Sequence, residues 1–185
     1  MTTLRADAER NRERALDHAT HVLADDPSAS VAEIAHAAGI GRATVYRHFP
    51  TREDLLAAID ERASREAEAA IAAARLAEGS ATAALERLVG ALLEIGDRYR
   101  FLLAEKLPEE RRRERDERLA APLFALVERG QASGEFNPEL APRWMLAVFG
   151  AVLVAALQEI TDGRLERVEA AAAVTATLLR GYGGG

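Results

Sequence analysis

Apolar residues recur at three- and four-residue intervals along nearly the whole chain, and segments that alternate apolar and polar residues are missing. The first pattern places apolar side chains on one face of an α-helix, whereas a half-buried strand needs the second. Proline and glycine interrupt this periodicity and mark the ends of the predicted helices. The sequence therefore predicts an all-α protein with helices at about residues 6–24, 31–39, 42–49, 52–76, 81–104, 109–120, 122–132, 141–161 and 165–182.

Composition excludes several kinds of site. The 185 residues contain no cysteine, which excludes disulfides, thiolate nucleophiles and cysteine-ligated metals. No basic stretch leads into an apolar signal core, so we expect a cytoplasmic protein. The longest apolar run, residues 144–157, covers 14 residues, whereas a membrane-spanning helix needs about 20. We therefore expect this run to form a buried helix and the protein to have no membrane partner.

The net charge of −6 is distributed unevenly. Residues 1–52 hold seven Arg and seven Asp or Glu, whereas residues 53–185 hold 17 Lys or Arg against 23 Asp or Glu. All four histidines also lie in the first part. This asymmetry permits contact with phosphates near the N-terminus, but it does not demonstrate such contact.

Capping residues delimit the early helices. Ser30 and Glu33 form a capping box, in which each side chain satisfies a backbone donor near the other, and Thr51 and Asp54 repeat the pattern. Gly39 suits the left-handed turn that follows a helix. The segment from 31 to 49 is thus predicted to be two short helices joined by a tight turn, stopped by the proline at position 50.

These two helices have the mechanics of a helix-turn-helix. The residues expected to pack inward are Ile34, Ala35, Ala38, Ile40, Val45 and Phe49. The opposite face of the second helix is then free to enter a major groove, and it carries Arg42, Ala43, Thr44, Tyr46, Arg47 and His48. Arginine can form a bidentate pair with guanine, and the small side chains can contact thymine methyl groups.

The residues of this segment resemble the TetR (tetracycline-repressor-like) family of transcription regulators. The resemblance covers roughly residues 10–60 and rests on Ile34-Ala35, Ala38-Gly39-Ile40, Thr44-Val45-Tyr46-Arg47-His48-Phe49-Pro50 and Arg52-Glu53-Asp54-Leu55-Leu56. The ordered series of Thr, Tyr, His and Phe, followed at once by a capped helix, is a more specific mark of this family than a helix-turn-helix alone.

The resemblance implies roles for individual residues. Arg42, Ala43 and Thr44 are expected to approach bases, and Tyr46, His48 and Arg52 to touch phosphates. Arg47 is expected at either a base or a phosphate. Ser30 begins a helix, where backbone donors favour an anion, so it is also expected near a phosphate. Gly41 stands where the family commonly has a capping side chain, which predicts a weaker cap.

Each assignment has an alternative. Tyr46 has the alternative role of a packed aromatic, and His48 that of a helix-end residue bonded to a local carbonyl. His18 and His21 share a helix face, but no second pair completes a metal site, and we expect no metal. Gly39 and Gly41 lack the third glycine and the preceding strand of a dinucleotide motif, so we expect no cofactor.

The Gly79-Ser80 pair is the candidate break between the long fourth helix and the rest. We expect a DNA-binding domain over 1–52 and a ligand-binding and dimerisation domain over 53–185, with 53–78 as the connecting helix. The resemblance implies a homodimer through the last two helices. Apolar and small residues form a seam on the last helix, namely Leu165, Val168, Ala172, Thr175, Leu179 and Tyr182.

A pocket for a small effector is expected among the middle helices. Its candidate lining residues are Leu92, Tyr99, Leu103, Phe124, Trp144 and Val148. Few polar groups stand among them, which favours an apolar or aromatic effector. For any single one of them, the sequence favours the alternative of an ordinary core residue.

The resemblance thus implies a ligand-responsive regulator, a repressor released by a small molecule from an inverted-repeat operator in double-stranded DNA. The alternative is an all-α binding protein or enzyme whose N-terminal helices are structural only. No nucleophile and base stand paired in the sequence, so we expect no catalytic residues.

Overall fold

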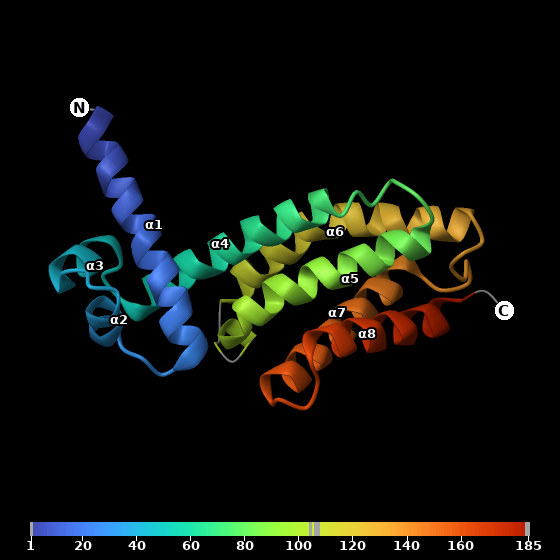
Figure 1. Ribbon diagram of the computed structural model, residues 1–185. Coiled ribbons are helices and arrows are strands. Elements are labelled where there is room, and N and C mark those ends of the chain that lie inside the picture. The colour runs from blue at the N-terminus through green and yellow to red at the C-terminus, as the bar shows by residue number, and fades with distance from the viewer. Residues whose placement is uncertain (1, 104, 106–107, 184–185) are drawn as a thin grey trace. The chain divides into compact units, whose positions relative to one another are not determined.

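The computed structural model describes residues 2–103, 105 and 108–183, with the backbone alone described at 2–9, 103, 109, 112 and 116. Over these residues the chain is helical and contains no strand, which confirms the predicted all-α class (Figure 1). The elements are α1 (Thr2–Asp25), α2 (Val31–Ala37), α3 (Arg42–His48), α4 (Arg52–Ala73), α5 (Ala81–Arg98), the 3-10 helix η1 (Arg100–Leu103), α6 (Glu109–Ala132), α7 (Pro142–Thr161) and α8 (Arg167–Tyr182).

The chain forms two compact units. Unit 1 comprises Met1–Ala63 and Arg98–Leu107, and unit 2 comprises Ser64–Asp97 and Pro108–Gly185. Helix α4 is therefore shared between the units, and η1 belongs with the N-terminal helices although it follows α5 in the chain. The sequence instead predicts one domain over residues 53–185, because the packing of a distant segment leaves no local signature.

Unit 1 has a core of its own. The buried side chains come from α1, α2, α3 and the first turns of α4, and the largest are Leu16, Leu23, Ile34, Val45, Phe49, Leu55 and Ile59. Leu16 and Leu23 are seven residues apart, and Val45 and Phe49, like Leu55 and Ile59, are four apart, which is the helical periodicity that the sequence predicts. The hydrophobic effect thus holds two seven-residue helices that are too short to be stable alone.

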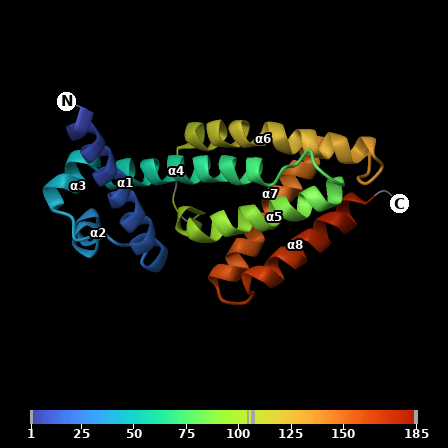
Figure 2. The ribbon, with the colours of Figure 1, turned by 45° about the horizontal axis from the view of Figure 1, so that its top comes forward.

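In unit 2, α7 and α8 lie side by side as an antiparallel pair (Figures 1 and 2). Helix α8 buries Ala170, Val174, Leu178 and Tyr182, which are spaced by four residues. The Tyr182 hydroxyl donates a hydrogen bond to the carbonyl of Met145 in α7. Of the predicted seam, Tyr182 is buried within the chain, whereas Val168 is 81% exposed and no helix in the described part of a single chain covers it.

Helix α6 corrects the predicted break at Pro122. The sequence predicted separate helices on either side of this proline, but α6 continues through it as one helix. Proline removes one backbone donor and crowds the preceding turn, a cost of about 3 kcal/mol or more. Burial of Leu126 and Val127 in the core of unit 2 offsets that cost. Tertiary packing thus overrides the local helix-breaking signal.

Helix α7 corrects the prediction of a buried helix over 144–157. It buries Met145, Phe149, Ala156 and Leu157 on one face, whereas Trp144 is 61% exposed. By length and composition it would also suffice to span a membrane, a test that core helices of soluble proteins pass as well. The opposite face of α7 is apolar and lies outside the core of unit 2.

The start of α5 is held by a carboxylate from a distant turn. Glu135 accepts the backbone N–H groups of Ala81 and Thr82, each at 2.9 Å, and the hydroxyl of Ser133 at 2.9 Å. The Thr82 and Ala81 hydrogen bonds lower the pKa of Glu135 from 4.5 to about 2. An anion at a helix N-terminus also interacts favourably with the helix dipole.

We predict that Glu135→Gln lowers the free energy of unfolding by about 1 kcal/mol near neutral pH, because an amide offers one acceptor oxygen to two N–H groups. The folded pKa lies below the ordinary value, so the carboxylate contributes its full stability above about pH 4.5 and loses it as the pH falls toward 2. Urea unfolding at several pH values should show the variant and wild type converging in acid. Glu128→Gln, at an exposed position of α6, is the control. A gap independent of pH would contradict this.

Candidate nucleic-acid interface and internal cavities

The turn between α2 and α3 is fixed by backbone hydrogen bonds. The N–H of Gly39 donates to the carbonyl of His36 at 3.1 Å, and the N–H of Ile40 donates to that of Ala35 at 3.0 Å. This pair of bonds is a Schellman motif, and Gly39 provides its left-handed residue with φ +62°. The predicted role of Gly39 is confirmed, although α2 itself ends two residues earlier.

Both predicted capping boxes are present. The N–H of Ser30 donates to Glu33 at 2.8 Å, and the N–H of Glu33 donates to the Ser30 hydroxyl at 3.3 Å. Thr51 and Asp54 exchange the equivalent bonds at 3.2 and 3.0 Å. At Gly41, by contrast, no side chain caps α3, as the sequence predicted.

Helix α3 is anchored on one side and exposed on the other. Val45 and Phe49 are buried at 1% and 2% exposure, and they share the core with Ile34 and Ala35 of α2. All four were predicted to face inward. Ala38 and Ile40, also predicted to pack inward, are half-buried. A four-residue interval of anchors fixes which face of α3 is presented to solvent.

The exposed face of α3 presents most of the predicted contact residues. Arg42, Ala43, Tyr46 and Arg47 are exposed, with Tyr46 at 45%, and Thr44 is half-buried. This exposure argues against Tyr46 as a packed core aromatic. Two guanidinium groups and a phenol on one short helix form a surface with hydrogen-bond donors for base edges and phosphates.

His48 is less exposed than Arg42, Ala43, Tyr46 and Arg47. It is half-buried, its ring tilts against that of Phe49 with centroids 6.2 Å apart, and its Nε2 is buried without a hydrogen-bond partner. A phosphate contact through Nε2 therefore requires the ring to turn outward.

Ser30 occupies an acidic setting. Its hydroxyl donates to Glu33 at 2.6 Å, and the Ser30 hydrogen bonds lower the pKa of Glu33. Asp26, whose pKa is lowered by its bonds to Ser28, adds a second carboxylate to the same connection. A phosphate at Ser30 would have to displace the Glu33 carboxylate, because both groups are anionic acceptors.

Arg52 has three partners within unit 1. Its guanidinium donates to the carbonyls of Ala29 and Pro27, each at 2.6 Å, and to Glu105 at 2.9 Å. It thus ties the start of α4 to the connection between α1 and α2. The predicted phosphate contact competes with these bonds. Glu105 lies 53 residues further along the chain, so no sequence pattern indicated the pair.

The segment after α5 is joined to unit 1 at a second point. Arg100 of η1 donates to the carbonyl of Ala24 near the end of α1 at 3.0 Å. Nearby, Tyr99 and Phe101 are buried at 5% and 3% exposure. Tyr99 is thus a buried residue of unit 1, whereas the sequence predicts it among the residues that line a pocket of the ligand-binding domain.

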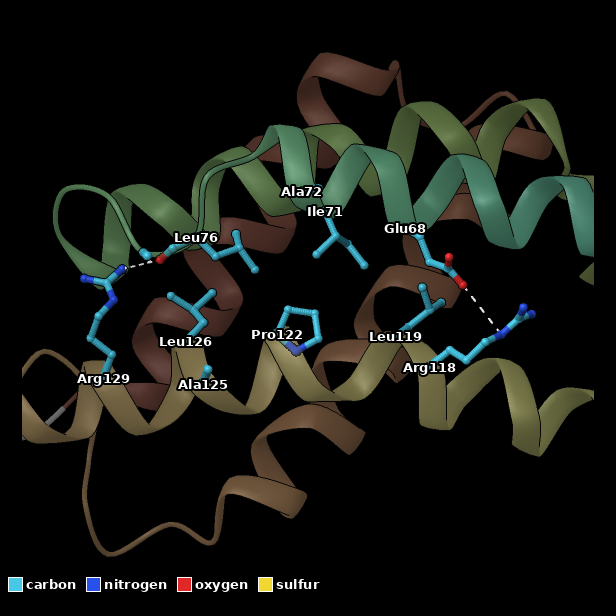
Figure 3. A pocket seen from close by; sticks show the side chains of 11 residues that line it. Glu68, Ile71, Ala72, Leu76, Arg118, Leu119, Pro122, Ala125, Leu126 and Arg129 are labelled. Atoms are coloured by element: carbon cyan, nitrogen blue, oxygen red, sulfur yellow. Dashed lines mark hydrogen bonds and ion pairs between the residues drawn. The ribbon is translucent and has the colours of Figure 1, made fainter.

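Unit 2 contains two cavities of substantial size. A cavity of about 420 Å³, here called the α4–α6 cavity, is lined by Glu68, Ile71, Ala72, Leu76, Ala77, Arg118, Leu119, Pro122, Ala125, Leu126 and Arg129 (Figure 3). A larger and more polar hollow of about 1100 Å³ extends along α6 and α7. Both exceed the roughly 300 Å³ at which small-molecule sites begin.

The residues predicted to line a pocket are dispersed. Leu92 and Phe124 line the larger hollow, whereas Trp144 is exposed and Val148 is half-buried against the core. Leu103, the remaining candidate, is described by its backbone alone, so its side chain is not placed. The α4–α6 cavity contains none of the six. Its lining comes from the predicted connecting helix and from α6, where the sequence predicts only Phe124 as a lining residue.

Comparison with known proteins assigns the family. The model of bacterial regulatory proteins of the tetR family matches residues 16–59, which include α2 and α3. The transcriptional repressor LfrR of Mycolicibacterium smegmatis is 37% identical over 159 residues, covering 84% of this chain and 82% of LfrR.

Solved structures agree with this assignment. The crystal structure of LfrR from Mycobacterium smegmatis in complex with proflavine has a TM-score of 0.74 at 32% identity, covering 93% of this chain and 96% of the other. A putative TetR-family regulator from Rhodococcus sp. has a TM-score of 0.76 at 19% identity, over 94% of this chain and 98% of the other, and so shares the fold. The chain belongs to the tetR family of bacterial regulatory proteins.

Proposed function

We propose that this protein is a transcriptional repressor that binds an inverted-repeat operator as a homodimer and is released by a small apolar or aromatic molecule. The observation that carries the proposal is the exposed face of α3, which is anchored by Val45 and Phe49 and presents Arg42, Tyr46 and Arg47 to solvent. The repressor activity of LfrR supports it.

On operator DNA, Arg42, Ala43 and Thr44 are proposed to approach base edges, since they begin α3. Tyr46 is proposed to bind a phosphate through its hydroxyl, and Arg47 either a base or a phosphate. Phosphate contacts position the helix, whereas base contacts select the sequence. Ser30, His48 and Arg52 are proposed phosphate ligands that must first rearrange, because local partners occupy or bury their polar atoms.

The proposed homodimer explains the exposed apolar face of α7. The exposed residues on this face are Trp144, Ala147, Ala151, Val154 and Ala155, and those on α8 include Val168, Ala172 and Ala176. Small side chains let two helices approach closely, and a two-fold axis makes such a surface complementary to itself. Two copies of the α7–α8 pair would bury both stripes, in agreement with the dimers expected for this family.

The effector is proposed to bind in unit 2. LfrR has been crystallised with proflavine, which is a planar aromatic molecule. The α4–α6 cavity has a predominantly apolar lining and a volume suited to such a molecule. Occupation of this cavity involves α4, whose first turn follows the recognition helix directly in the chain.

The first prediction separates base contacts from phosphate contacts. Arg42→Ala should cost about 1–3 kcal/mol on the preferred operator and relax the preference at one position in each half-site. Tyr46→Phe removes only a hydroxyl and should weaken binding to all sequences nearly equally. Titration against a library of randomised sites would distinguish these effects, with Arg111→Ala, an exposed arginine of α6, as the charge-matched control. Unchanged binding in both variants would refute the helix-turn-helix interpretation.

The second prediction concerns the pairing of Arg52 with Glu105. Glu105→Gln removes the carboxylate that competes with phosphate for Arg52, so operator affinity should rise and the salt dependence should steepen by up to about one counterion per subunit. The measurement is operator affinity at several salt concentrations. Glu110→Gln, an exposed glutamate of α6, controls for net charge. The gain should vanish in an Arg52→Gln background, and its persistence there would contradict the mechanism.

The third prediction tests the dimer. Wild type should sediment at about 40 kDa, twice the 20.0 kDa of one chain, at micromolar concentration. Val154→Glu places a charge on the exposed face of α7 and should shift the protein toward 20.0 kDa. Ala121→Glu, at an exposed position of α6, should leave the mass unchanged. A wild-type monomer that binds operator tightly would overturn this part of the proposal.

A further inference from the structure

The α4–α6 cavity contains a carboxylate with an unsatisfied oxygen. Glu68 lies at one end of the cavity with Arg118, and Arg129 lies at the other end (Figure 3). The Oε1 atom of Glu68 is buried and accepts no hydrogen bond. Buried acceptors are normally paired, because leaving one unsatisfied is costly. This oxygen therefore indicates that a ligand of the cavity carries a hydrogen-bond donor.

The pairing with Arg118 does not satisfy Glu68. The Nε of Arg118 lies 3.5 Å from Oε1, whereas charge-assisted hydrogen bonds between nitrogen and oxygen are about 2.7–2.9 Å long. Both side chains are also substantially exposed, at 43% and 41%, and ion pairs in such positions contribute little. A cationic N–H group can therefore replace Arg118 beside Glu68, while the arginine turns to water on its flexible stem.

The opposite end of the cavity does not favour an anion. Arg129 donates through Nη1 to the carbonyl of Gly79 and through Nη2 to that of Leu76, each at 2.7 Å. Its charge is thus directed to carbonyls that follow α4. Its Nε is buried without an acceptor, so a neutral acceptor such as a ring nitrogen or an ether suits this end. An anion would in addition be repelled by Glu68.

The wall between the two ends is apolar. Ile71 and Leu76 lie on one side, and Leu119 and Leu126 lie on the other (Figure 3). Pro122 stands between the two leucines of α6 and has no N–H group, so this helix presents a ring and no additional donor to the cavity. Eleven residues of α6 separate Arg118 from Arg129, a rise of about 16 Å. The site is suited to an elongated ligand.

We propose that the α4–α6 cavity binds an elongated, mainly apolar cation whose N–H group hydrogen-bonds to Glu68 in place of Arg118. This inference rests on the proposed function, since it takes the cavity as the effector site, and it adds the charge of the ligand and the residue that selects it.

The test compares two three-ring probes of similar shape. Proflavine carries a positive charge at neutral pH, whereas acridone is neutral. Isothermal titration calorimetry of the purified protein should show that Glu68→Gln weakens proflavine binding by about tenfold or more, because a charged hydrogen bond is lost, and changes acridone binding by less than about twofold. Glu86→Gln, an exposed glutamate of α5, is the matched control and should bind both probes as wild type does.

A second variant keeps the test decisive if Glu68→Gln fails to fold. Arg118→Gln removes the competing cation and should tighten proflavine binding by about threefold to tenfold without affecting acridone. The proposal is overturned if proflavine does not bind wild type, if Glu68→Gln weakens both probes equally or neither, or if Arg118→Gln weakens proflavine.

Operator binding measured on the same samples separates this inference from the function on which it rests. If wild type binds operator and is released by acridone but not by proflavine, the cation assignment fails and the regulator remains. If wild type binds no operator, the proposed function fails, whatever the calorimetry shows.

Discussion

The burial of Val45 and Phe49 is the constraint on which the nucleic-acid interface depends. A helix of seven residues such as α3 is unstable alone, because the cost of nucleation exceeds the gain from its few hydrogen bonds. Its two anchors, packed with Ile34 and Ala35, supply the missing stability and also set its rotation. The same two buried side chains therefore stabilise α3 and turn Arg42 and Tyr46 toward solvent. The Schellman turn at Gly39 fixes where the helix begins.

Charged side chains link segments that the chain separates widely. Arg52 joins α4 to the α1–α2 connection and to Glu105, and Arg100 reaches the carbonyl of Ala24. The segment between α5 and α6 is thereby part of unit 1, while the helices on either side of it build unit 2.

Unit 2 combines a buried hydrophobic core with an exposed apolar face on α7 and a cavity between α4 and α6. Tyr182 and Met145 join α8 to α7, whereas the opposite face of α7 exposes Trp144 and alanines. The α4–α6 cavity likewise leaves an oxygen of Glu68 and the Nε of Arg129 without hydrogen-bond partners. We propose that a second copy of the chain covers the apolar surface and that a ligand pairs with the polar atoms, because apolar surface is stabilised by burial and polar atoms by hydrogen bonds.

The sequence by itself determined the all-α class, the capping boxes at Ser30 and Thr51, the turn at Gly39 and the exposed face of α3, because these depend on interactions within a few residues. Only the tertiary structure decided that α6 continues through Pro122 and that Arg52 pairs with Glu105. It also decided that the cavity lies between α4 and α6, and that one face of α7 remains exposed. These features depend on contacts between distant segments, whose free energies outweigh local preference and leave no periodic trace in the chain.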